Sequence, residues 1–483
     1  MKLFATIIAL AGVFAASAQA HQETNISKWQ FSQTGTEWKA VTVPHDWAIS
    51  GPFDKKWDLQ MVAIKENGED KPTEHSGRSG SLPWIGKGFY KTTVHIAEGT
   101  AYAELKFDGA MAAPEVSVNG KKTGHWAYGY NAFRVDITPY IHTGDNLIEV
   151  VLENEEESNR WYPGGGIYRP VTLITHANKS RLDLWGLQMQ TLSIDGGSAL
   201  IDIRHEGKDI PADAMLKVTV TDKGGKVVAN ASSPADGMGG FHTQMSIANP
   251  QLWSPEAPYL YDVKLSLEAD GKTLDVQHQK LGVRTVKFSA ECGFQLNGVT
   301  RKIKGVCLHH DLGPLGAAVN KAAIIRQIRI MKDMGADAIR TSHNMPSTMQ
   351  MEVCDSMGMM VMAESFDGWK EPKVRNGYGK LWDEWWQKDI TNLILNHRNH
   401  PSIIIWSVGN EIPEQWKPEG VERYKHLTAL CHRLDPSRQV TCGMDQPDGT
   451  MWAGFAQVAD VPGYNYRVHK YEEMMKRLPQ GFL

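Results

Sequence analysis

The hexapeptide WSVGNE at 406–411 places an amide and a carboxylate side by side at the end of a long apolar run. The run SIIIWSV has the composition of a strand buried on both faces. Glu411 can protonate a leaving oxygen, provided that an apolar wall and a neighbouring carboxylate raise its pKa. Asn410 can bond a sugar hydroxyl, an interaction that strengthens in the transition state. We therefore expect acid/base chemistry at Glu411; the alternative interpretation of the Asn–Glu pair is a helix cap.

Further polar side chains follow other apolar runs: Arg340, His343, His309, Asp311 and Tyr466. Arg340 and His343 can hold Glu411 or a second carboxylate in its ionised form, although a plain buried ion pair is the alternative. His309 and its neighbour His310 point to opposite faces if they lie on a strand. We therefore expect hydrogen bonding to substrate or to a carboxylate there, and we predict neither a metal ligand set nor an organic cofactor.

The segments that must position these side chains alternate between apolar strands and amphipathic helices after about residue 285. Strands are expected at 302–308, 336–342, 359–365, 402–410, 439–444 and 461–466, and helices at 322–335, 348–358, 381–398, 424–434 and 472–478. Without a glycine fingerprint of the doubly wound folds, this alternation favours a (β/α)8 TIM barrel. The polar residues would then meet at the carboxyl ends of the strands. About six strands are present, and residues 482–483 resemble the start of a seventh.

The preceding chain is predicted to form two β domains behind a targeting segment. Residues 1–20 have the charged start, the short apolar core and the Ala-Gln-Ala end of a cleavable signal peptide. Alternating short strands predict a β-sandwich or jelly roll at 21–178 and an immunoglobulin-like β-sandwich at 179–284. The barrel, incomplete at its carboxyl end, would occupy 285–483. We therefore expect a periplasmic or secreted protein.

The amino-acid composition indicates which classes of molecule the protein can bind. The 483 residues carry a net charge of −4, which implies no polycationic surface for nucleic acid. His21, rather than a cysteine, follows the expected cleavage site, so no membrane anchor is predicted. Sixteen tryptophans in an exported chain favour an oligosaccharide or glycoside substrate, because indole rings stack on the flat faces of sugars.

Six longer motifs span most of the chain: VPHDWAI (43–49), SNRWYPGGGIYRPV (158–171), LGVRTVKF (281–288), KGVCLHHDLG (304–313), MKDMGADAIRTSHNMP (331–346) and NHPSIIIWSVGNE (399–411). Together they resemble glycoside hydrolase family 2, the β-galactosidase, β-glucuronidase and β-mannosidase group, and most of all its exported β-galactosidase-type members. The resemblance implies a jelly-roll sugar-binding domain, an immunoglobulin-like sandwich and a catalytic barrel. Family members are often oligomeric, so a homo-oligomer is compatible with it.

Site roles follow from the resemblance residue by residue. Glu411 falls on the acid/base position and Asn410 on the partner of the sugar 2-hydroxyl, and Arg340, His343 and His309 fall on active-site positions. Asp46, Arg160 and Trp161 match segments of the amino-terminal domain that can reach the barrel mouth. Tyr466 matches the tyrosine beside the nucleophile.

Two departures from the family pattern qualify these implications. Glu364 lacks the histidine that follows two residues later in magnesium-binding members. Family members are retaining enzymes whose nucleophilic glutamate ends strand seven, and no residue here can be assigned that role. We expect a retaining β-glycosidase, most consistent with β-galactosides, whose chain as given is truncated and has little turnover. The alternatives are a non-catalytic carbohydrate-binding protein or pseudoenzyme, and a β-glucuronide or β-mannoside as the substrate.

Overall fold

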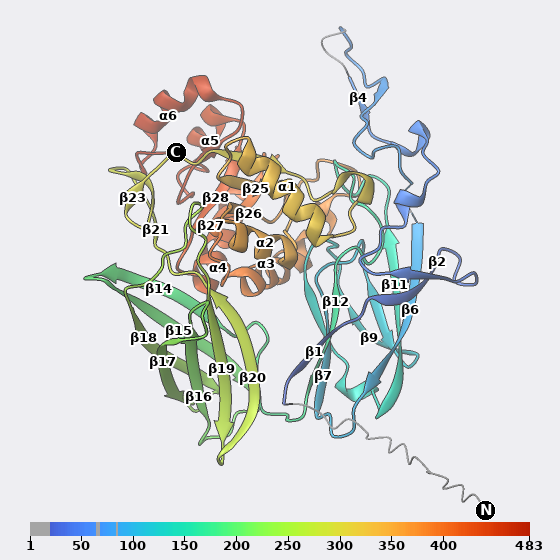
Figure 1. The fold of residues 1–483 in the computed structure, drawn as a ribbon. Coiled ribbons are helices and arrows are strands. Elements are labelled where there is room, and N and C mark those ends of the chain that lie inside the picture. The colour runs from blue at the N-terminus through green and yellow to red at the C-terminus, as the bar shows by residue number, and fades with distance from the viewer. Residues whose placement is uncertain (1–19, 64–67, 84–85) are drawn as a thin grey trace, which may run out of the picture.

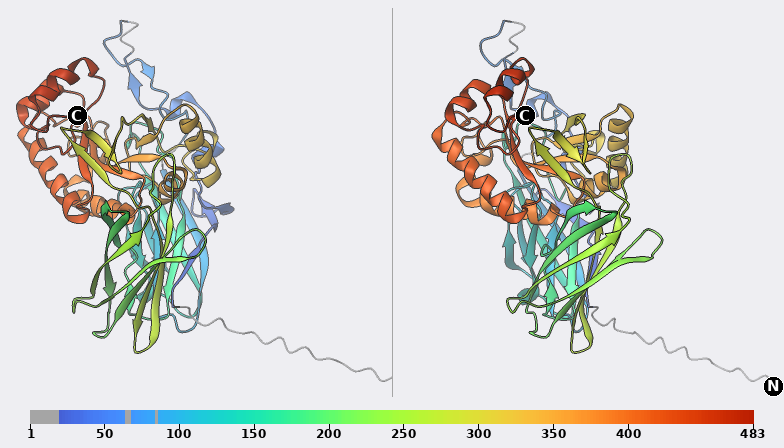
Figure 2. Two further views of the ribbon diagram at one scale, coloured as in Figure 1. Left: turned by 60° about the vertical axis from the view of Figure 1, so that its left-hand side comes forward. Right: turned by 90° about the vertical axis from the view of Figure 1, so that its left-hand side faces the viewer.

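The computed structural model describes residues 20–63, 68–83 and 86–483. The expected signal peptide, apart from Ala20, lies outside the described residues. Two β-sandwiches stand side by side, and a curved parallel sheet with its helices lies across one end of both (Figures 1 and 2). No helix in the described part of the chain is long and apolar enough to cross a membrane.

The amino-terminal sandwich consists of two antiparallel sheets with the orders β1-β12-β7-β10 and β3-β2-β6-β11-β8-β9. Along β11, Ile148, Val150 and Leu152 are fully buried and alternate with more exposed residues, as expected of a strand with one face on a core. The strands of this domain are Gln22–Asn25 (β1), Lys28–Ser32 (β2), Lys39–Thr42 (β3), Met61–Val62 (β4), Glu74–His75 (β5), Gly86–Ile96 (β6), Tyr102–Phe107 (β7), Glu115–Val118 (β8), Lys121–His125 (β9), Phe133–Asp136 (β10), Gly144–Asn154 (β11) and Val171–His176 (β12).

The second sandwich has the expected immunoglobulin-like size and buries a separate apolar cluster. One sheet has the order β17-β16-β19-β20, and in the other β15 pairs with β13, β14 and β18. Its strands are Arg181–Leu182 (β13), Gln188–Asp195 (β14), Ser198–Lys208 (β15), Met215–Thr221 (β16), Val227–Pro234 (β17), Gly240–Ala248 (β18), Tyr261–Ala269 (β19) and Lys272–Leu281 (β20).

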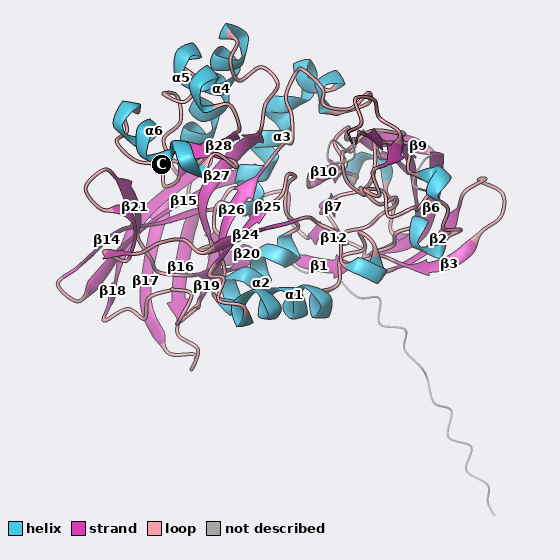
Figure 3. Cartoon of the chain, turned by 90° about the horizontal axis from the view of Figure 1, so that it is seen from above, coloured by secondary structure: helices cyan, strands magenta, loops and turns pink. Residues whose placement is uncertain are grey.

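The last part of the described chain holds six parallel strands in chain order, which confirms an incomplete barrel. The strands are Gly305–Leu308 (β24), Ala338–Thr341 (β25), Met360–Glu364 (β26), Ile403–Asn410 (β27), Gln439–Met444 (β28) and Gly463–Tyr464 (β29). The helices are Lys321–Asp333 (α1), Thr348–Met357 (α2), Trp382–His397 (α3), Pro418–Leu434 (α4), Pro447–Ala453 (α5) and Tyr471–Arg477 (α6). Figure 3 shows α1 and α2 at the β24 end of the sheet and α4 and α5 at the β28 end.

The structure differs from the expectation in several places, among them helix α5, which was not expected. Residues 482–483 belong to no strand. A small antiparallel sheet formed by Val286–Ser289 (β21), Gly293–Leu296 (β22) and Val299–Thr300 (β23) precedes β24. Phe294 and Leu296 of β22 join an apolar cluster with Met360 at the amino end of β26. This sheet therefore covers the end of the parallel strands opposite to their carboxyl ends.

Arg169 joins the amino-terminal sandwich to the barrel. It is 1% exposed, and its guanidinium donates to the carbonyls of Asp108 (3.1 Å) and Tyr130 (2.8 Å) in its own domain. It also donates to the carbonyls of Met345 (2.7 Å) and Pro346 (3.2 Å), which follow β25. Since hydrogen bonds to a charged group are worth about 1.5–3 kcal/mol, this residue fixes the two domains firmly to each other.

Candidate active site

A buried carboxylate organises the carboxyl ends of β25, β26 and β27. Glu364 is the last residue of β26 and has no exposed surface. It accepts hydrogen bonds from Arg340 Nε (2.7 Å) and Ser407 Oγ (2.5 Å), and its other oxygen contacts His343 Nδ1. Arg340 and His343 therefore meet a second carboxylate instead of Glu411, which was one of the two arrangements expected from the sequence.

Arg340 links the buried Glu364 to Asn410 through hydrogen bonds to both side chains. Arg340 Nη2 donates to Asn410 Oδ1 at 3.0 Å. Asn465, which follows β29, donates to the same oxygen at 3.0 Å and to Glu411 Oε1 at 2.9 Å. Asn410 and Glu411 are thus held in place by groups from two other strands, an arrangement unlike a helix cap.

Glu411 lies at the end of β27 in a half-buried position. Its φ of 45° and the φ of 62° at Tyr466 fall in the left-handed region, which residues other than glycine seldom adopt and which is enriched at functional sites. Burial alone would raise the pKa of Glu411. Hydrogen bonds from Tyr466 and Asn465 and the charges of Lys373 and Arg160 outweigh it and hold this pKa below its usual range.

The sequence makes proton donation by Glu411 conditional on a raised pKa, which an apolar wall and a neighbouring carboxylate would provide. Apart from burial, the strongest influences on the pKa of Glu411 are two hydrogen-bond donors and two cations, so the described surroundings do not meet this condition. Tyr466 is affected in the opposite sense, since its hydrogen bond to Glu411 raises the pKa of the phenol to about 12.

Another carboxylate, Asp367, connects the amino-terminal sandwich to the barrel at the carboxyl ends of the strands. Arg160 of the amino-terminal domain donates to both of its oxygens at 2.6 Å. Lys373 Nζ and Asn410 Nδ2 each donate to Asp367 Oδ1 at 3.0 Å. Burial alone would raise the pKa of Asp367, but these donors and positive charges outweigh burial and lower this pKa to about 2. Asp367 is therefore ionised and fully occupied by its partners.

Trp161 and His309 form an aromatic group beside this network. The Trp161 ring lies 4.5 Å from the His309 ring and 5.0 Å from the His343 ring, measured between centroids. The Arg160 guanidinium lies over the Trp161 ring at 4.5 Å. Burial and the nearby His343 lower the pKa of His309 to about 4, so its imidazole is neutral at pH 7. The structure thus brings Arg160 and Trp161 to the mouth, as the resemblance implied.

Two of the expected site residues, Asp46 and Asp311, lie outside the hydrogen-bond network described above. Asp46 is 1% exposed, and its oxygens accept from Tyr162 Oη (2.5 Å) and from the backbone N–H groups of Ala48, Gly165 and Ala317. It pins two loops to one another and has no free oxygen for a sugar. Asp311 is partly exposed, and one of its oxygens accepts from Gly313 N at 3.4 Å.

A cavity of about 350 Å³ lies next to Arg160, Asp367 and Lys373. Its other walls come from both domains and include Tyr128, Tyr130, Trp369, Tyr378 and Trp385. Tyr128 Oη donates to Asn344 Oδ1 at 2.9 Å across the boundary. This aromatic cavity beside the polar network has room for a small ligand.

Five polar residues of this network were not among the expected site residues: Glu364, Asp367, Lys373, Ser407 and Asn465. Glu364, Asp367 and Asn465 each follow or end an expected strand, so their position could have identified them. Lys373 lies in the long loop between β26 and α3, and no motif marks it.

Two β-sandwiches precede an incomplete parallel barrel, and a loop of the first sandwich meets an Asn–Glu pair at the barrel mouth. This combination defines a multidomain glycoside hydrolase. Comparison with known proteins identifies its family. The sequence matches the sugar binding domain of glycosyl hydrolases family 2 over residues 7–177, the second domain of this family over 187–284, and its TIM barrel domain over 290–480. The chain belongs to glycosyl hydrolase family 2.

Relatives agree with this assignment. The chain is 34% identical to beta-galactosidase BoGH2A of Bacteroides ovatus, over 89% of this chain and 53% of that protein. It is 31% identical to a beta-glucuronidase of Bacteroides fragilis, over 72% of this chain and 52% of that protein. The crystal structure of a family 2 member from Bacteroides cellulosilyticus superimposes with a TM-score of 0.86 at 32% identity, covering 95% of this chain and 60% of that one. The chain thus spans about half the length of these curated relatives.

Proposed function

We propose that this chain forms the acid/base half of a retaining β-glycosidase that acts on terminal β-D-galactosides. The arrangement at the end of β27 carries the proposal: Glu411 faces the mouth while Asn465 holds both its carboxylate and the side chain of Asn410. A carboxyl group and an amide held in this way can protonate a glycosidic oxygen and bond the adjacent hydroxyl. The similarity to a beta-galactosidase over 89% of the chain supports the choice of sugar.

The other residues of the mouth have supporting roles in this proposal. Arg340 and Glu364 are positioning residues, because they act on the sugar through Asn410. Trp161, with the neutral His309 beside it, offers an apolar face to the sugar ring. His343, Asp311 and Tyr466 are further candidate sugar contacts, and Tyr466 also tunes the charge of Glu411.

The attacking carboxylate is proposed to lie outside the described network. A retaining glycosidase needs two carboxylates about 5–5.5 Å apart, one of them free to attack. Glu364 is buried and bonded to three side chains, and Asp367 is bonded to three others. Neither has the freedom of a nucleophile. A further carboxylate in the mouth would also raise the pKa of Glu411, because like charges favour the protonated form.

The reaction then follows in two steps. The attacking carboxylate forms a covalent bond to the anomeric carbon while Glu411 donates its proton to the leaving oxygen. Glu411, now ionised, removes a proton from water as this water displaces the carboxylate, which returns the sugar with its β configuration. The basic surroundings of Glu411 favour the ionised form that the second step requires.

The test compares two chains on 4-nitrophenyl β-D-galactoside: the 483 residues and the product of the gene read through any continuation. We expect little turnover from the 483 residues and ordinary turnover from the longer product, which Glu411→Gln reduces by at least 10³-fold. Turnover by the 483-residue chain would place the nucleophile within it. A longer product that binds galactose but hydrolyses no aryl β-glycoside would favour the carbohydrate-binding alternative.

One observation favours a β-glucuronide as the second candidate substrate. Arg160 and Lys373 both contact Asp367, so this corner of the mouth places two cationic side chains beside Asn410. A sugar carboxylate would be attracted to them. The same assay with 4-nitrophenyl β-D-glucuronide discriminates, because Lys373→Met should then reduce kcat/KM for the glucuronide far more than for the galactoside.

A further inference from the structure

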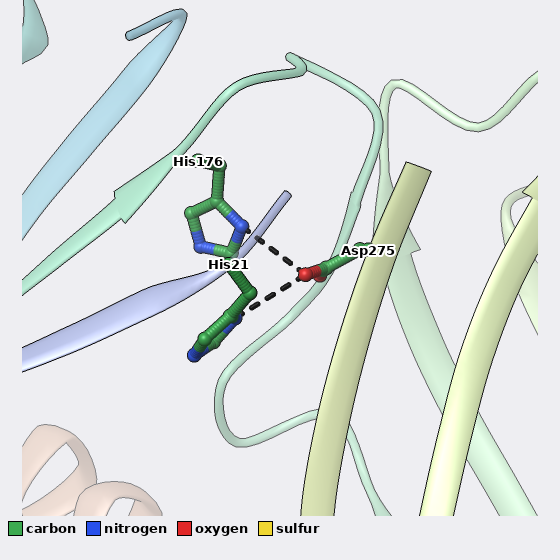
Figure 4. Close-up of side chains that lie close together, drawn as sticks. All are labelled: His21, His176 and Asp275. Carbon is green, nitrogen blue, oxygen red and sulfur yellow. Dashed lines mark hydrogen bonds and ion pairs between the residues drawn. The ribbon is translucent and has the colours of Figure 1, made fainter. Parts of the chain in front are cut away.

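Three potential metal ligands meet far from the active site, where the amino-terminal strand contacts the second sandwich. They are His21, His176 and Asp275 (Figure 4). His21 precedes β1, His176 ends β12, and Asp275 lies in β20. Within the described residues, no other group of three His, Cys, Asp or Glu side chains has its ligand atoms as close together as these, which lie within 4.8 Å of one another.

Strand pairing explains why the two histidines meet. β1 and β12 are antiparallel with Gln22 opposite Thr175, so one further step of the same register sets His21 opposite His176. Side chains of opposite residues lie on the same face of a sheet. The two imidazole rings accordingly pack edge to face with centroids 4.7 Å apart. The strand pairing therefore places two imidazole rings together on one face of the sheet.

Asp275 supplies the third ligand from the neighbouring domain. Its side chain has no exposed surface, and backbone N–H groups orient both of its oxygens: Val276 N to Oδ1 and Leu182 N to Oδ2, each at 2.8 Å. Oδ1 lies 3.2 Å from His21 Nδ1 and 3.4 Å from His176 Nδ1. Donor atoms around a tetrahedral zinc ion with bonds of about 2.0–2.1 Å are separated by roughly 3.3–3.4 Å. Two edges of the cluster already match this spacing.

Two details distinguish the cluster from an ordinary ion pair. The side chain of His176 is 3% exposed, and its buried Nδ1 lacks the alignment of a hydrogen bond to Asp275 despite the 3.4 Å separation. A buried nitrogen without a hydrogen bond is costly unless another group occupies the space it faces. On the far side of His21, Nε2 contacts Glu23 Oε1 at 3.1 Å. A carboxylate on the second ring nitrogen is the usual support of a metal-bound histidine.

We propose that His21, His176 and Asp275 bind a Zn²⁺ ion that clips the start of the chain to the immunoglobulin-like sandwich. Two imidazoles and one carboxylate suit this borderline cation, and a water molecule can take the fourth position. The ion ties β1 and β12 of one domain to β20 of the next. Its role is structural, and it is independent of the proposed glycosidase activity.

A proton is the rival occupant of the same space. Burial lowers the pKa of His21, but its bonds to Asp275 and Glu23 outweigh burial and raise this pKa to about 9 in the absence of metal. A protonated His21 would form an ion pair with Asp275 and exclude the cation. Direct measurement of bound zinc decides between the two.

The experiment treats the full chain with a chelator, dialyses it, and titrates it with ZnCl₂ while bound zinc is counted by mass spectrometry. We expect one tightly bound zinc per chain and a zinc-dependent increase in Tm. His21→Gln should weaken zinc binding at least 100-fold and abolish the increase in Tm. Glu23→Gln, which leaves all three ligands in place, should weaken binding about 10–100-fold.

His95→Gln is the matched control, because His95 pairs with Asp145 at 2.9 Å on the same domain but lies on its surface. It should change neither quantity. His21 lies at the edge of its domain, so its variant should fold; X-ray absorption of the wild-type complex provides a second readout, with nitrogen and oxygen ligands expected at about 2.0–2.2 Å. The proposal is wrong if the wild-type chain binds no stoichiometric zinc, or if His21→Gln binds it as tightly as the wild type.

Discussion

Arg340 contacts a single oxygen of Glu364 with two nitrogens, Nε at 2.7 Å and Nη2 at 2.6 Å. Glu364 is fully buried, and Arg340 is nearly so, with 14% of its side chain exposed. The guanidinium also donates from Nη2 to Asn410 Oδ1 at 3.0 Å and from Nη1 to Asn465 Oδ1 at 3.5 Å. The orientation of the side chain expected to contact the sugar is therefore decided one strand away, by a carboxylate that no substrate can reach.

Glu364→Gln should destabilise the protein strongly. The substitution leaves the buried charge of Arg340 without its counter-ion, a change that costs about 3–5 kcal/mol in comparable buried pairs. Urea denaturation followed by tryptophan fluorescence measures the loss. Glu384→Gln is the matched control, since Glu384 forms an exposed ion pair with Lys388 on α3, and it should leave the midpoint unchanged. Equal midpoints for the two variants would contradict the prediction.

Asp389 on α3 should make stability fall as pH rises. Its oxygens accept from Tyr378 Oη (2.6 Å), Trp126 Nε1 and Asn131 Nδ2 (both 2.9 Å), yet burial dominates and raises its pKa to about 7. The folded state then binds more protons than the unfolded state between about pH 4 and pH 7, so the free energy of unfolding decreases across this window. At about 1.4 kcal/mol per pKa unit, the contribution reaches at most about 4 kcal/mol.

The isosteric variant Asp389→Asn isolates this effect, because its amide does not titrate. Urea denaturation of both proteins from pH 4 to pH 8 gives two stability curves. We expect the difference between them to shift in favour of the variant as pH rises, and to level off above about pH 7. Parallel curves would show that Asp389 does not titrate in this window.

Tyr466→Phe should raise the pKa of Glu411. The phenol donates to the carboxylate and stabilises its ionised form, so its loss leaves burial less opposed. Carboxyl ¹³C NMR of glutamate-labelled protein measures the titration, and Glu411→Gln assigns the signal. Tyr471→Phe is a suitable control, because Tyr471 donates to the carbonyl of Tyr464 instead. An unchanged titration midpoint of Glu411 in Tyr466→Phe would contradict the hydrogen bond between the phenol and this carboxylate.

Arg160→Lys should loosen the loop that carries Trp161. A lysine cannot reproduce the two-pronged contact with Asp367, and it stacks less well on an indole ring. We expect amide hydrogen exchange across residues 158–163 to accelerate about tenfold, as measured by mass spectrometry. Arg375→Lys serves for comparison, because Arg375 is exposed and pairs with Glu157 at only 3.6 Å. Exchange that is equal in the two variants would contradict a role for the Asp367 contact.

The parallel strands were predictable because burial on both faces leaves a continuous apolar run. The run at 402–410 anticipated β27 to within one residue at its start. Helix α4 begins at Pro418, six residues before the expected start, because its polar first turn carries no apolar period while proline suits that position. The short strands β21–β23 escaped prediction, since segments of two to four residues contain too few alternations to reveal their period.

From the strand pattern alone, the site was predictable only where a residue ends a strand, whereas Arg160 and Trp161 were expected from the family resemblance. Asn410 and Glu411 were found in this way, since the carboxyl ends of barrel strands meet at one mouth. Lys373 was not found, because a loop position becomes informative only when the loop is folded over Asp367. The direction in which the pKa of Glu411 shifts could not be read from the sequence for the same reason: it depends on hydrogen bonds from Tyr466 and Asn465 and on cations from two loops, one of them in another domain.

The four carbonyl contacts of Arg169 have a consequence for how a ligand enters the mouth of the barrel. A rotation of the amino-terminal sandwich against the barrel would strip a fully buried guanidinium of half its partners, without water to replace them. Clamshell motion between these two bodies is therefore disfavoured. The binding site formed by Arg160, Trp161 and the barrel rim is therefore preorganised before a ligand arrives. Its selectivity rests on shape complementarity to the ligand, and not on domain closure around it.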